Sequence, residues 1–312
     1  MKTTISKPKN RLRSFTEPYI KHWRLMLMFL PGLIALILFC YYPMYGILIA
    51  FKDFKMLKGI SGSEWVGLEY FKRLFGDEEF WRVFRNTLRI SILKLVIAFP
   101  APIIFALCLN ELRNLKFKKA VQTVTYLPYF FSWVVLGGMM LMIFSTTGPI
   151  NKILSHITSE PISFFGSGFW FIVLILVTSV WQGTGWSAIV YIAALSGIDM
   201  SLYEAAEVDG ASRWKQTLHI TLPCLLPTII TVFILNLGKV MEVGFDQIYN
   251  MYNPMVYDVA DIIDTYVLRK LQNMNYSLGT AVGLFKSVIS LVLVISSNYI
   301  VNKITDGEQG LW

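Results

Sequence analysis

The chain has 312 residues, of which 55% are hydrophobic and only 15% charged, and its mean hydropathy is +0.54. Soluble domains carry about a quarter charged residues, so this composition excludes an ordinary soluble enzyme and also a disordered or fibrous chain. The net charge of +8 is concentrated beside apolar runs, in residues 1–24 and 112–119, as in the positive-inside pattern of membrane proteins. No motif of a nucleic-acid-binding protein accompanies it, so we expect membrane lipid and no nucleic acid as a partner.

Six apolar segments are each long enough to cross a hydrocarbon core of roughly 30 Å as a helix. The first follows residues 1–24, which we expect to form a basic cytoplasmic segment. It is too long for the apolar part of a signal peptide and lacks a small-residue cleavage site, so we interpret it as an uncleaved span. The expected spans are residues 25–50, 86–110, 121–144, 169–195, 223–243 and 278–301.

These segments predict an all-α membrane protein with six transmembrane helices in a single transmembrane domain, residues 25–312, with a core at 86–301. The segments that an N-in and C-in arrangement places inside carry more Lys and Arg than the outer ones, which favours that orientation. Residues 51–86 weaken the bias, but their basic and acidic residues nearly balance, and a balanced loop can be exported. Prolines within the spans predict kinks at Pro100, Pro102, Pro128 and Pro227.

Residues 201–223, between the fourth and fifth expected spans, have the pattern of two short helices. Ser201 and Glu204 have the spacing of a capping box, which predicts the start of the first helix. Gly210 is suited to end that helix, because glycine adopts positive φ without steric cost. A second short helix, about residues 212–219, then leads into Pro223, which suits the first turn of the fifth span. Two such helices outside the bilayer would form a rigid handle for another protein.

The same residues resemble the EAA motif of bacterial ATP-binding-cassette (ABC) importer permeases. The motif reads Glu-Ala-Ala, three residues, Gly, nine residues, Ile, one residue, Leu-Pro. Every position is met here, by Glu204-Ala205-Ala206, Gly210, Ile220 and Leu222-Pro223. We refer to residues 201–223 as the coupling loop.

The resemblance extends beyond this loop to the maltose-permease-like sugar group. It is carried by residues 65–71 (WVGLEYF), 86–88 (NTL), 127–128 (LP) and 148–151 (GPIN). The chain departs from that group after the fifth span, where Tyr252-Asn253-Pro254 stands in place of Gly-Gly-Pro. This variant resembles the oligosaccharide/polysaccharide permease subgroup of Firmicutes, as do residues 260–266, 281–287 and 310–312.

The resemblance implies a subunit of an ATP-driven oligosaccharide importer in the bacterial cell membrane. In such importers two permease subunits form the pathway, and an extracellular lipid-anchored binding protein delivers the solute. Two ATPase subunits, dedicated or shared among several sugars, bind ATP and Mg²⁺ and receive the coupling loops. The implied ATPase-coupling residues of this chain are Glu204, Ala205, Ala206, Asp209 and Gly210.

The chain itself has no phosphate-binding loop of the form G-x-x-x-x-G-K-[ST]. Gly238-Lys239 is followed by Val240 and lies in an apolar segment. We therefore expect no cofactor in this chain and no enzymatic activity. Cysteine and histidine spacings predict neither a disulfide, a metal site nor a catalytic arrangement.

Charged residues inside spans are costly and are therefore candidates for function. Lys94, Lys239 and Lys286 lie at similar depths, about 12, 7 and 10 Å below the outer ends of their helices at 1.5 Å per residue. They either snorkel to the outer interface, with Lys239 pairing with Glu242, or line a cationic outer cavity. Glu242 is the only acidic residue near enough in sequence to neutralise one of them. The cavity reading predicts an anionic cargo, a uronate-containing oligosaccharide.

Polar and aromatic residues of the fourth and fifth spans complete the predicted pathway. Aromatic faces pack on sugar C–H groups and amides bond sugar hydroxyls, although tryptophan is also common at membrane interfaces. The resemblance to maltose-type permeases places a sugar at Gln182, Trp186 and Asn236, but other positions of that pattern fall on Val240 and Val243. The predicted substrate pathway consists of Trp181, Gln182, Trp186, Asn236, Lys239, Lys94 and Lys286.

Two alternatives stay open at this point. Permeases for other solutes, such as peptides, carry similar coupling loops, so the cargo rests on the motifs outside the loop. An ion-gradient-driven transporter would lack the loop and usually shows repeated halves, which this chain does not show.

Overall fold

The computed structural model describes residues 22–158 and 160–304 of the chain. The chain forms two compact units, Met1–Gly67 and Leu68–Trp312. The basic segment predicted for residues 1–24 lies almost entirely outside the described residues, as do residues 310–312.

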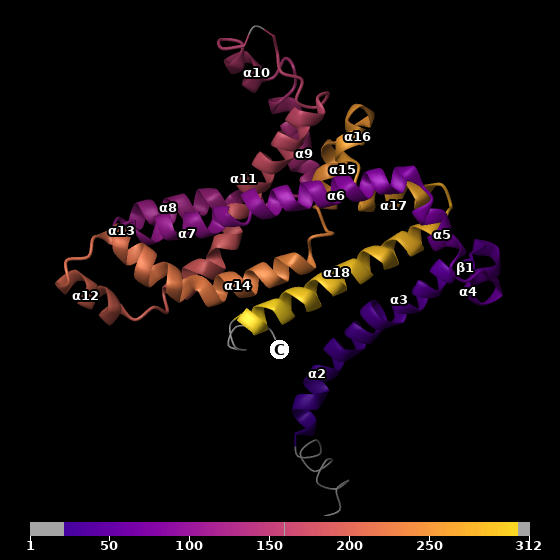
Figure 1. The fold of residues 1–312 in the computed structure, drawn as a ribbon, viewed down its shortest axis with the longest axis horizontal. Coiled ribbons are helices and arrows are strands. Elements are labelled where there is room, and N and C mark those ends of the chain that lie inside the picture. The colour runs from indigo at the N-terminus through magenta and orange to yellow at the C-terminus, as the bar shows by residue number, and fades with distance from the viewer. Residues whose placement is uncertain (1–21, 159, 305–312) are drawn as a thin grey trace, which may run out of the picture. The chain divides into compact units, whose positions relative to one another are not determined.

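The first unit consists of an apolar helical run and a short hairpin (Figure 1). The run, Trp23–Phe51, is long and apolar enough to cross a membrane. Its pieces are α2 (Trp23–Leu36), a π-helical turn (Ile37–Tyr41), α3 (Tyr42–Met44) and a 3-10 turn (Tyr45–Phe51). The hairpin pairs two antiparallel strands, β1 (Lys52–Asp53) and β2 (Glu64–Trp65), around a 3-10 turn (Met56–Lys58) and α4 (Gly59–Gly62).

The second unit contains the other helices and no strand among its described residues. Its first half comprises α5 (Glu69–Phe75), α6 (Glu78–Ile97), α7 (Pro100–Asn110), α8 (Leu115–Tyr126), a 3-10 turn (Leu127–Phe130), α9 (Trp133–Ile143) and α10 (Pro149–Leu154). Its second half comprises α11 (Gly168–Leu195), α12 (Met200–Val208), α13 (Arg213–Gln216), a π-helical turn (Thr217–Thr221), α14 (Leu222–Gly238), α15 (Phe245–Met251), a 3-10 turn (Pro254–Val256), α16 (Tyr257–Ala260), α17 (Ile263–Gln272) and α18 (Tyr276–Ile304).

Five helical runs among the described residues are long and apolar enough to span a membrane, and a sixth arises if one bent pair is counted as a span. The bent pair is the expected third span, which is not a straight helix. Leu115–Phe130 and Trp133–Ile143 meet at 103°. Phe131 and Ser132, between them, adopt extended backbone angles, and the Ser132 hydroxyl accepts the N–H of Val135 to begin α9. The kink predicted at Pro128 is therefore close to the observed break, but the bend is larger than a kink within one helix.

Two π-helical turns each end directly before the residue that precedes a proline. The N–H of Tyr42 bonds to the carbonyl of Ile37 before Pro43, and the N–H of Leu222 bonds to the carbonyl of Thr217 before Pro223. A proline in a helix has no N–H to donate, and its ring clashes with the carbonyl four residues earlier. The wider π turn relieves that clash and lets the helix continue. The second short helix predicted at 212–219 is therefore not separate but runs on into the fifth span, Arg213–Gly238.

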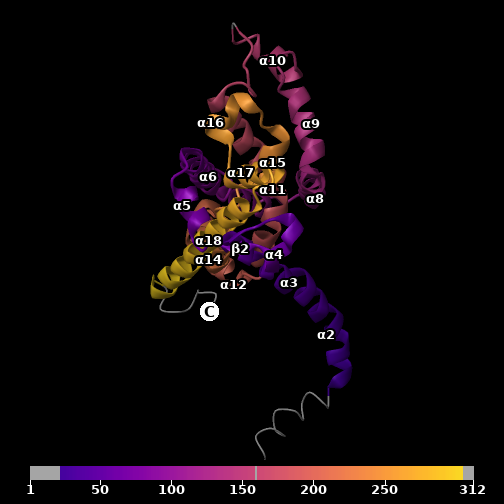
Figure 2. The ribbon, with the colours of Figure 1, turned by 90° about the vertical axis from the view of Figure 1, so that its right-hand side faces the viewer.

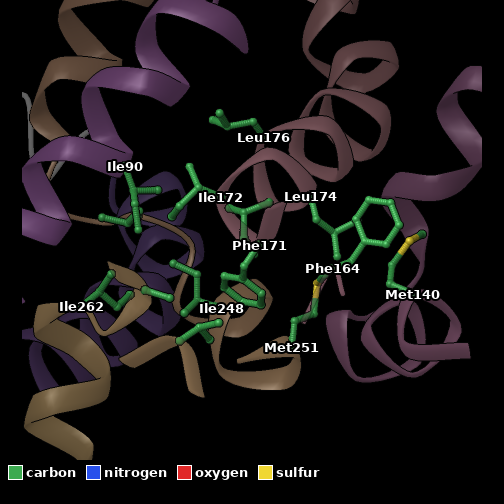
Figure 3. Packing of buried hydrophobic residues seen from close by; sticks show 14 residues of the cluster. Ile90, Met140, Phe164, Phe171, Ile172, Leu174, Leu176, Ile248, Met251 and Ile262 are labelled. Carbon is green, nitrogen blue, oxygen red and sulfur yellow. The ribbon is translucent and has the colours of Figure 1, made fainter. Parts of the chain in front are cut away.

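Helix α11 lies at the centre of the second unit and contacts α6, α7, α8 and α14. Near its start, Phe171 and Ile172 pack with Ile90 of α6 and with Ile248 and Met251 of α15 (Figure 3). Near its end, α11 shares a second cluster with α7 and α14, formed by Ile103, Ala106, Ala188, Tyr191, Leu195 and Leu225. Apolar residues around most of its circumference agree with a membrane-spanning helix that contacts neighbouring helices on some faces and leaves others exposed in this chain.

Close backbone approach brings α11 against α8. A Cβ atom built on Gly185 would lie 2.2 Å from the carbonyl oxygen of Thr125, so only glycine fits at this crossing. On the other side, α14 and α18 lie next to each other in both views (Figure 1 and Figure 2). Helix α12 lies at the end of this unit opposite to α5 and α17 (Figure 1).

An ion-pair cluster joins the start of α6 to α17. The fully buried Asp261 carboxylate accepts hydrogen bonds from Arg269 at 2.7 and 2.5 Å and from the Thr265 hydroxyl at 2.7 Å. Glu79 accepts from Arg269 at 3.0 Å and from Lys270 at 3.0 Å. The bonds to Asp261 raise the pKa of Arg269 further above its ordinary value, so the guanidinium stays charged. This cluster holds the segment after α16 against the start of the second span.

Candidate functional site

A polar cavity of about 390 Å³ opens among α6, α7, α11, α14 and residues 239–244, which we name the cavity turn. Four residues predicted for the substrate pathway line it: Lys94, Gln182, Asn236 and Lys239. The other lining residues used below are Ser91, Trp133, Ser179, Glu242 and Gln247. The cavity thus collects two lysines, one glutamate, several amides and hydroxyls and one tryptophan within an apolar bundle.

The cavity turn ends α14 about five residues earlier than the expected span. It is held from α6 at both ends: the Ser91 hydroxyl donates to the carbonyl of Val240, and the Lys94 ammonium donates to the carbonyl of Val243 at 2.7 Å. Gly244 closes the turn with φ +88° and begins α15. Because Ser91 and Lys94 are three residues apart on α6, they lie on one face of that helix.

Gln247, in the first turn of α15, lines the cavity beside Lys94 and is 1% exposed. Its amide nitrogen donates to the carbonyl of Ile175 and to the Thr178 hydroxyl, both at 2.8 Å. Its amide oxygen accepts from Lys94 at 2.6 Å and from the Ser179 hydroxyl at 2.8 Å. All four hydrogen-bonding positions of the amide are therefore occupied, and its orientation is determined.

Lys239 and Glu242 stand on the cavity turn itself. They are joined through the backbone, where the Glu242 N–H donates to the Lys239 carbonyl at 2.7 Å. In the part of the chain that the structure describes, their side chains form no ion pair with each other. The pairing that the sequence left open for Lys239 is therefore not formed.

Three predicted pathway residues do not line this cavity. Trp186 stacks on Tyr129 with ring centroids 4.7 Å apart, at the bend of the broken third span, and Trp181 is partly exposed. Lys286 donates to the Asp264 carboxylate at 2.5 Å. The expectation that only Glu242 could neutralise one of the lysines is wrong, because α17 packs on α18 and brings Asp264 to Lys286 from 22 residues earlier.

Ser91, Ser179 and Gln247 were missed by sequence reasoning. Ser91 and Ser179 are small hydroxyl residues of a kind common within apolar helices. Gln247 lies just beyond the expected end of the fifth span, so it was assigned to an outer loop. The neighbouring Asp246 gives this segment the look of a solvated loop, so the sequence held no clear signal for the buried amide.

The coupling loop forms a short helix, α12, with a defined end on each side. Its N-cap is Asp199, whose carboxylate accepts the N–H of Ser201 at 3.0 Å. This bond lowers the pKa of Asp199. The predicted capping box of Ser201 and Glu204 is therefore wrong, because an aspartate two residues earlier supplies a charged acceptor and the helix begins sooner.

At its other end α12 closes with a Schellman motif. The N–H of Ala211 bonds to the carbonyl of Ala206 at 2.9 Å, and the N–H of Gly210 bonds to that of Glu207 at 3.0 Å. Gly210 has φ +72°, as this motif requires. The predicted helix end at Gly210 is confirmed.

The surface of the coupling loop is exposed along α12. Glu204, Ala205, Asp209 and Gly210 are exposed and Ala206 is half-buried. Apolar side chains are exposed beside them, with Val208 at 89% and Trp214 at 71%. The base of the loop is tied down by a hydrogen bond of 2.9 Å between the hydroxyls of Tyr203 and Thr221. Arg213 also reaches Glu111, at the end of α7, at 3.3 Å.

Residues 98–306 match the family described as binding-protein-dependent transport system inner membrane components, and the chain belongs to that family. It is therefore a membrane permease subunit of an ABC importer, with ATP hydrolysis in separate subunits. The predicted family, permease fold and membrane location are confirmed.

The chain is similar over almost its whole length to two proteins of Bacillus subtilis (strain 168). It is 44% identical to the protein LplB, over 92% of this chain and 91% of that one. It is 43% identical to the polygalacturonan/rhamnogalacturonan transport system permease protein YteP, over 99% and 96%. It also resembles a chain of a solved bacterial ABC transporter involved in the import of the acidic polysaccharide alginate, with a TM-score of 0.86 and 39% identity over 95% of this chain and all of that one.

Proposed function

We propose that this subunit forms half of the pathway of an importer for oligosaccharides that carry carboxylate groups. The other half is a second permease subunit. An extracellular lipid-anchored binding protein delivers the cargo, and two ATPase subunits, dedicated or shared among several sugars, bind ATP and Mg²⁺. Support comes from relatives similar over nearly the whole chain, one named for polygalacturonan and rhamnogalacturonan and one for the acidic polysaccharide alginate.

The main support for this proposal is the positive charge of the polar cavity. Lys94 and Lys239 line it and only one carboxylate, that of Glu242, faces them among its lining residues. At an effective dielectric constant near 20, an ammonium 4 Å from a carboxylate gains roughly 4 kcal/mol. Desolvation of both groups offsets part of that gain, which suits a carrier that must also release its cargo. Gln182 and Asn236 offer amides to sugar hydroxyls, and Trp133 offers an aromatic face.

The coupling loop suits the docking of an ATPase subunit. An exposed helix with both ends defined, two adjacent alanines and apolar side chains beside them presents a firm surface to a groove. We assign Glu204, Ala205, Ala206, Asp209 and Gly210 to this contact. Peptides and other small solutes, the alternatives that the coupling loop leaves open, fit the cavity less well than oligosaccharides, because its lining offers amides, hydroxyls and an aromatic face together.

Uptake of matched substrates tests the cargo. We expect cells or proteoliposomes with the whole importer to take up a uronate oligosaccharide with a KM at least about tenfold below that of its carboxyl-reduced counterpart, a preference of roughly 1.4 kcal/mol. The reduced oligosaccharide has the same length and linkages, so the comparison isolates the carboxylates. Equal KM values for both substrates would contradict the proposal.

Reporter fusions test the orientation. With both termini inside, a reporter enzyme active only outside the cell is expected to be silent after Lys119 and after Trp312 and active after Lys152. Expression of each fusion is measured with an antibody, so that silence is not mistaken for absence. An active fusion after Trp312 would overturn the C-in arrangement.

A further inference from the structure

We infer that Lys94, held in place by Gln247, forms a subsite in the polar cavity for a carboxylate group of the cargo. This inference rests on the proposed function, because it assigns the group that distinguishes an acidic from a neutral oligosaccharide. It also divides the roles of the two cavity lysines, which the sequence had treated alike.

Lys94 is a charge without a counter-charge. An ammonium has three N–H donors, and here two of them bond to neutral acceptors, the Val243 carbonyl at 2.7 Å and the Gln247 amide oxygen at 2.6 Å. No carboxylate lies within ion-pair distance of Lys94 in the described part of the chain, whereas Lys270 has two and Lys286 has one. One N–H therefore has no protein acceptor among the described residues, and the side chain borders the cavity.

Holding the cavity turn does not explain a charge at this position. At the other end of the same turn, Ser91 holds the Val240 carbonyl with a neutral hydroxyl. A neutral donor is thus sufficient to anchor this backbone, and it avoids the cost of placing an ammonium in a bundle of low polarity. An anionic group that enters the cavity would supply the missing counter-charge and accept the remaining N–H.

Gln247 makes the subsite rigid, which defines it as a positioning residue. Its two amide N–H groups are anchored on α11, at Ile175 and Thr178, so its oxygen must face Lys94. Ser179 bonds the same oxygen and prevents the amide from turning. The Lys94 ammonium is consequently held before cargo arrives and need not be ordered by binding.

Lys239 differs in this respect. It stands at the end of α14 on the cavity turn, and no side-chain hydrogen bond or ion pair of Lys239 is found among the described residues. The Lys239 ammonium can therefore change position as the cargo moves, whereas the Lys94 ammonium is held in one position. The two lysines together give a site with one rigid and one adaptable cation.

The test is the ratio of KM for the carboxyl-reduced oligosaccharide to KM for the uronate oligosaccharide, measured with the whole importer in proteoliposomes. Lys94→Met keeps the apolar stem and Lys94→Gln keeps a donor, and both remove the charge. We expect either change to lower the ratio about tenfold, mainly by raising KM for the acidic substrate. A loss of assembled transporter lowers the maximal rate for both substrates and leaves this ratio unchanged.

Ser91→Ala is the matched control. It releases the other end of the cavity turn without removing a charge, so we expect its ratio to stay within about twofold of wild type. A second control, Lys286→Gln combined with Asp264→Asn, removes a paired lysine outside the cavity and should also keep the ratio. If Ser91→Ala lowers the ratio as much as Lys94→Met does, then release of the cavity turn, and not loss of the Lys94 charge, causes the change. The inference is then wrong.

Failure of the inference is distinct from failure of the proposed function. If the wild-type importer shows no preference for the acidic substrate, the proposed cargo is wrong. If the wild type prefers the acidic substrate and both Lys94 variants keep that preference, the cargo stands and Lys94 is not its subsite.

Discussion

Replacing Gly210 by valine is expected to lower uptake at least about tenfold without removing the protein from the membrane. Gly210 has φ +72°, a conformation that costs an L-residue roughly 1–2 kcal/mol and a β-branched residue more. A Cβ atom built on Gly210 meets no atom within 4 Å, so the damage expected from the substitution is to the backbone conformation. Loss of the Schellman bonds would unwind the end of α12, which we assign to the ATPase contact. Uptake and the amount of co-purifying ATPase measure the effect.

Gly210→Asn is the control for this result, because asparagine tolerates the left-handed region far better than valine. We expect it to keep most of the uptake and of the bound ATPase. Full uptake with Gly210→Val, together with normal recovery of the ATPase subunits, would show that the shape of this loop does not matter for coupling.

Replacing Arg269 by methionine is expected to reduce the free energy of unfolding by about 3–5 kcal/mol, because it leaves the fully buried Asp261 carboxylate without its cation. The Thr265 hydroxyl would be its only remaining side-chain partner among the described residues. Thermal unfolding of the purified importer in lipid nanodiscs measures the loss, which should appear as a lower midpoint.

Arg82→Gln provides the comparison for that prediction. It removes another ion pair of the same region, between Arg82 and Asp258, but the Asp258 side chain is 85% exposed. A pair of this kind contributes about 0–1 kcal/mol, so the unfolding midpoint should hardly move. Equal losses for the two variants would contradict the expectation that the buried pair contributes more to stability than the exposed pair.

The spans and the coupling loop could be predicted from sequence because their signals are local. Apolar length identifies a helix that crosses a membrane, and Gly210 and Pro223 act on the backbone within a few residues of themselves. The bend after Phe130 was predictable only in part. Pro128 predicts a kink close to this place, but it does not predict the size of the bend or the extended backbone of Phe131 and Ser132.

The cavity was predictable only in part, because its wall is made by contacts between distant segments. Gln182, Asn236 and Lys239 were found from their residue types inside spans. Gln247 bonds to Lys94 across 153 residues, and Lys286 meets Asp264 through the packing of α17 on α18. Such partners depend on tertiary packing, and no spacing in the sequence encodes them.

The continuous run from Arg213 to Gly238 has a mechanical consequence. Its 26 residues, about 39 Å at 1.5 Å per residue, join the base of the coupling loop to the cavity turn without a loop between them. The π-helical turn and Pro223 lie in the half of the run nearer the loop, and Pro227 lies close to its middle; at these places missing hydrogen bonds make the helix easier to bend. The remaining turns, up to Asn236, are regular. A displacement of the loop is thus partly absorbed by flexure near the prolines, and the remainder moves the cavity end as one stiff piece.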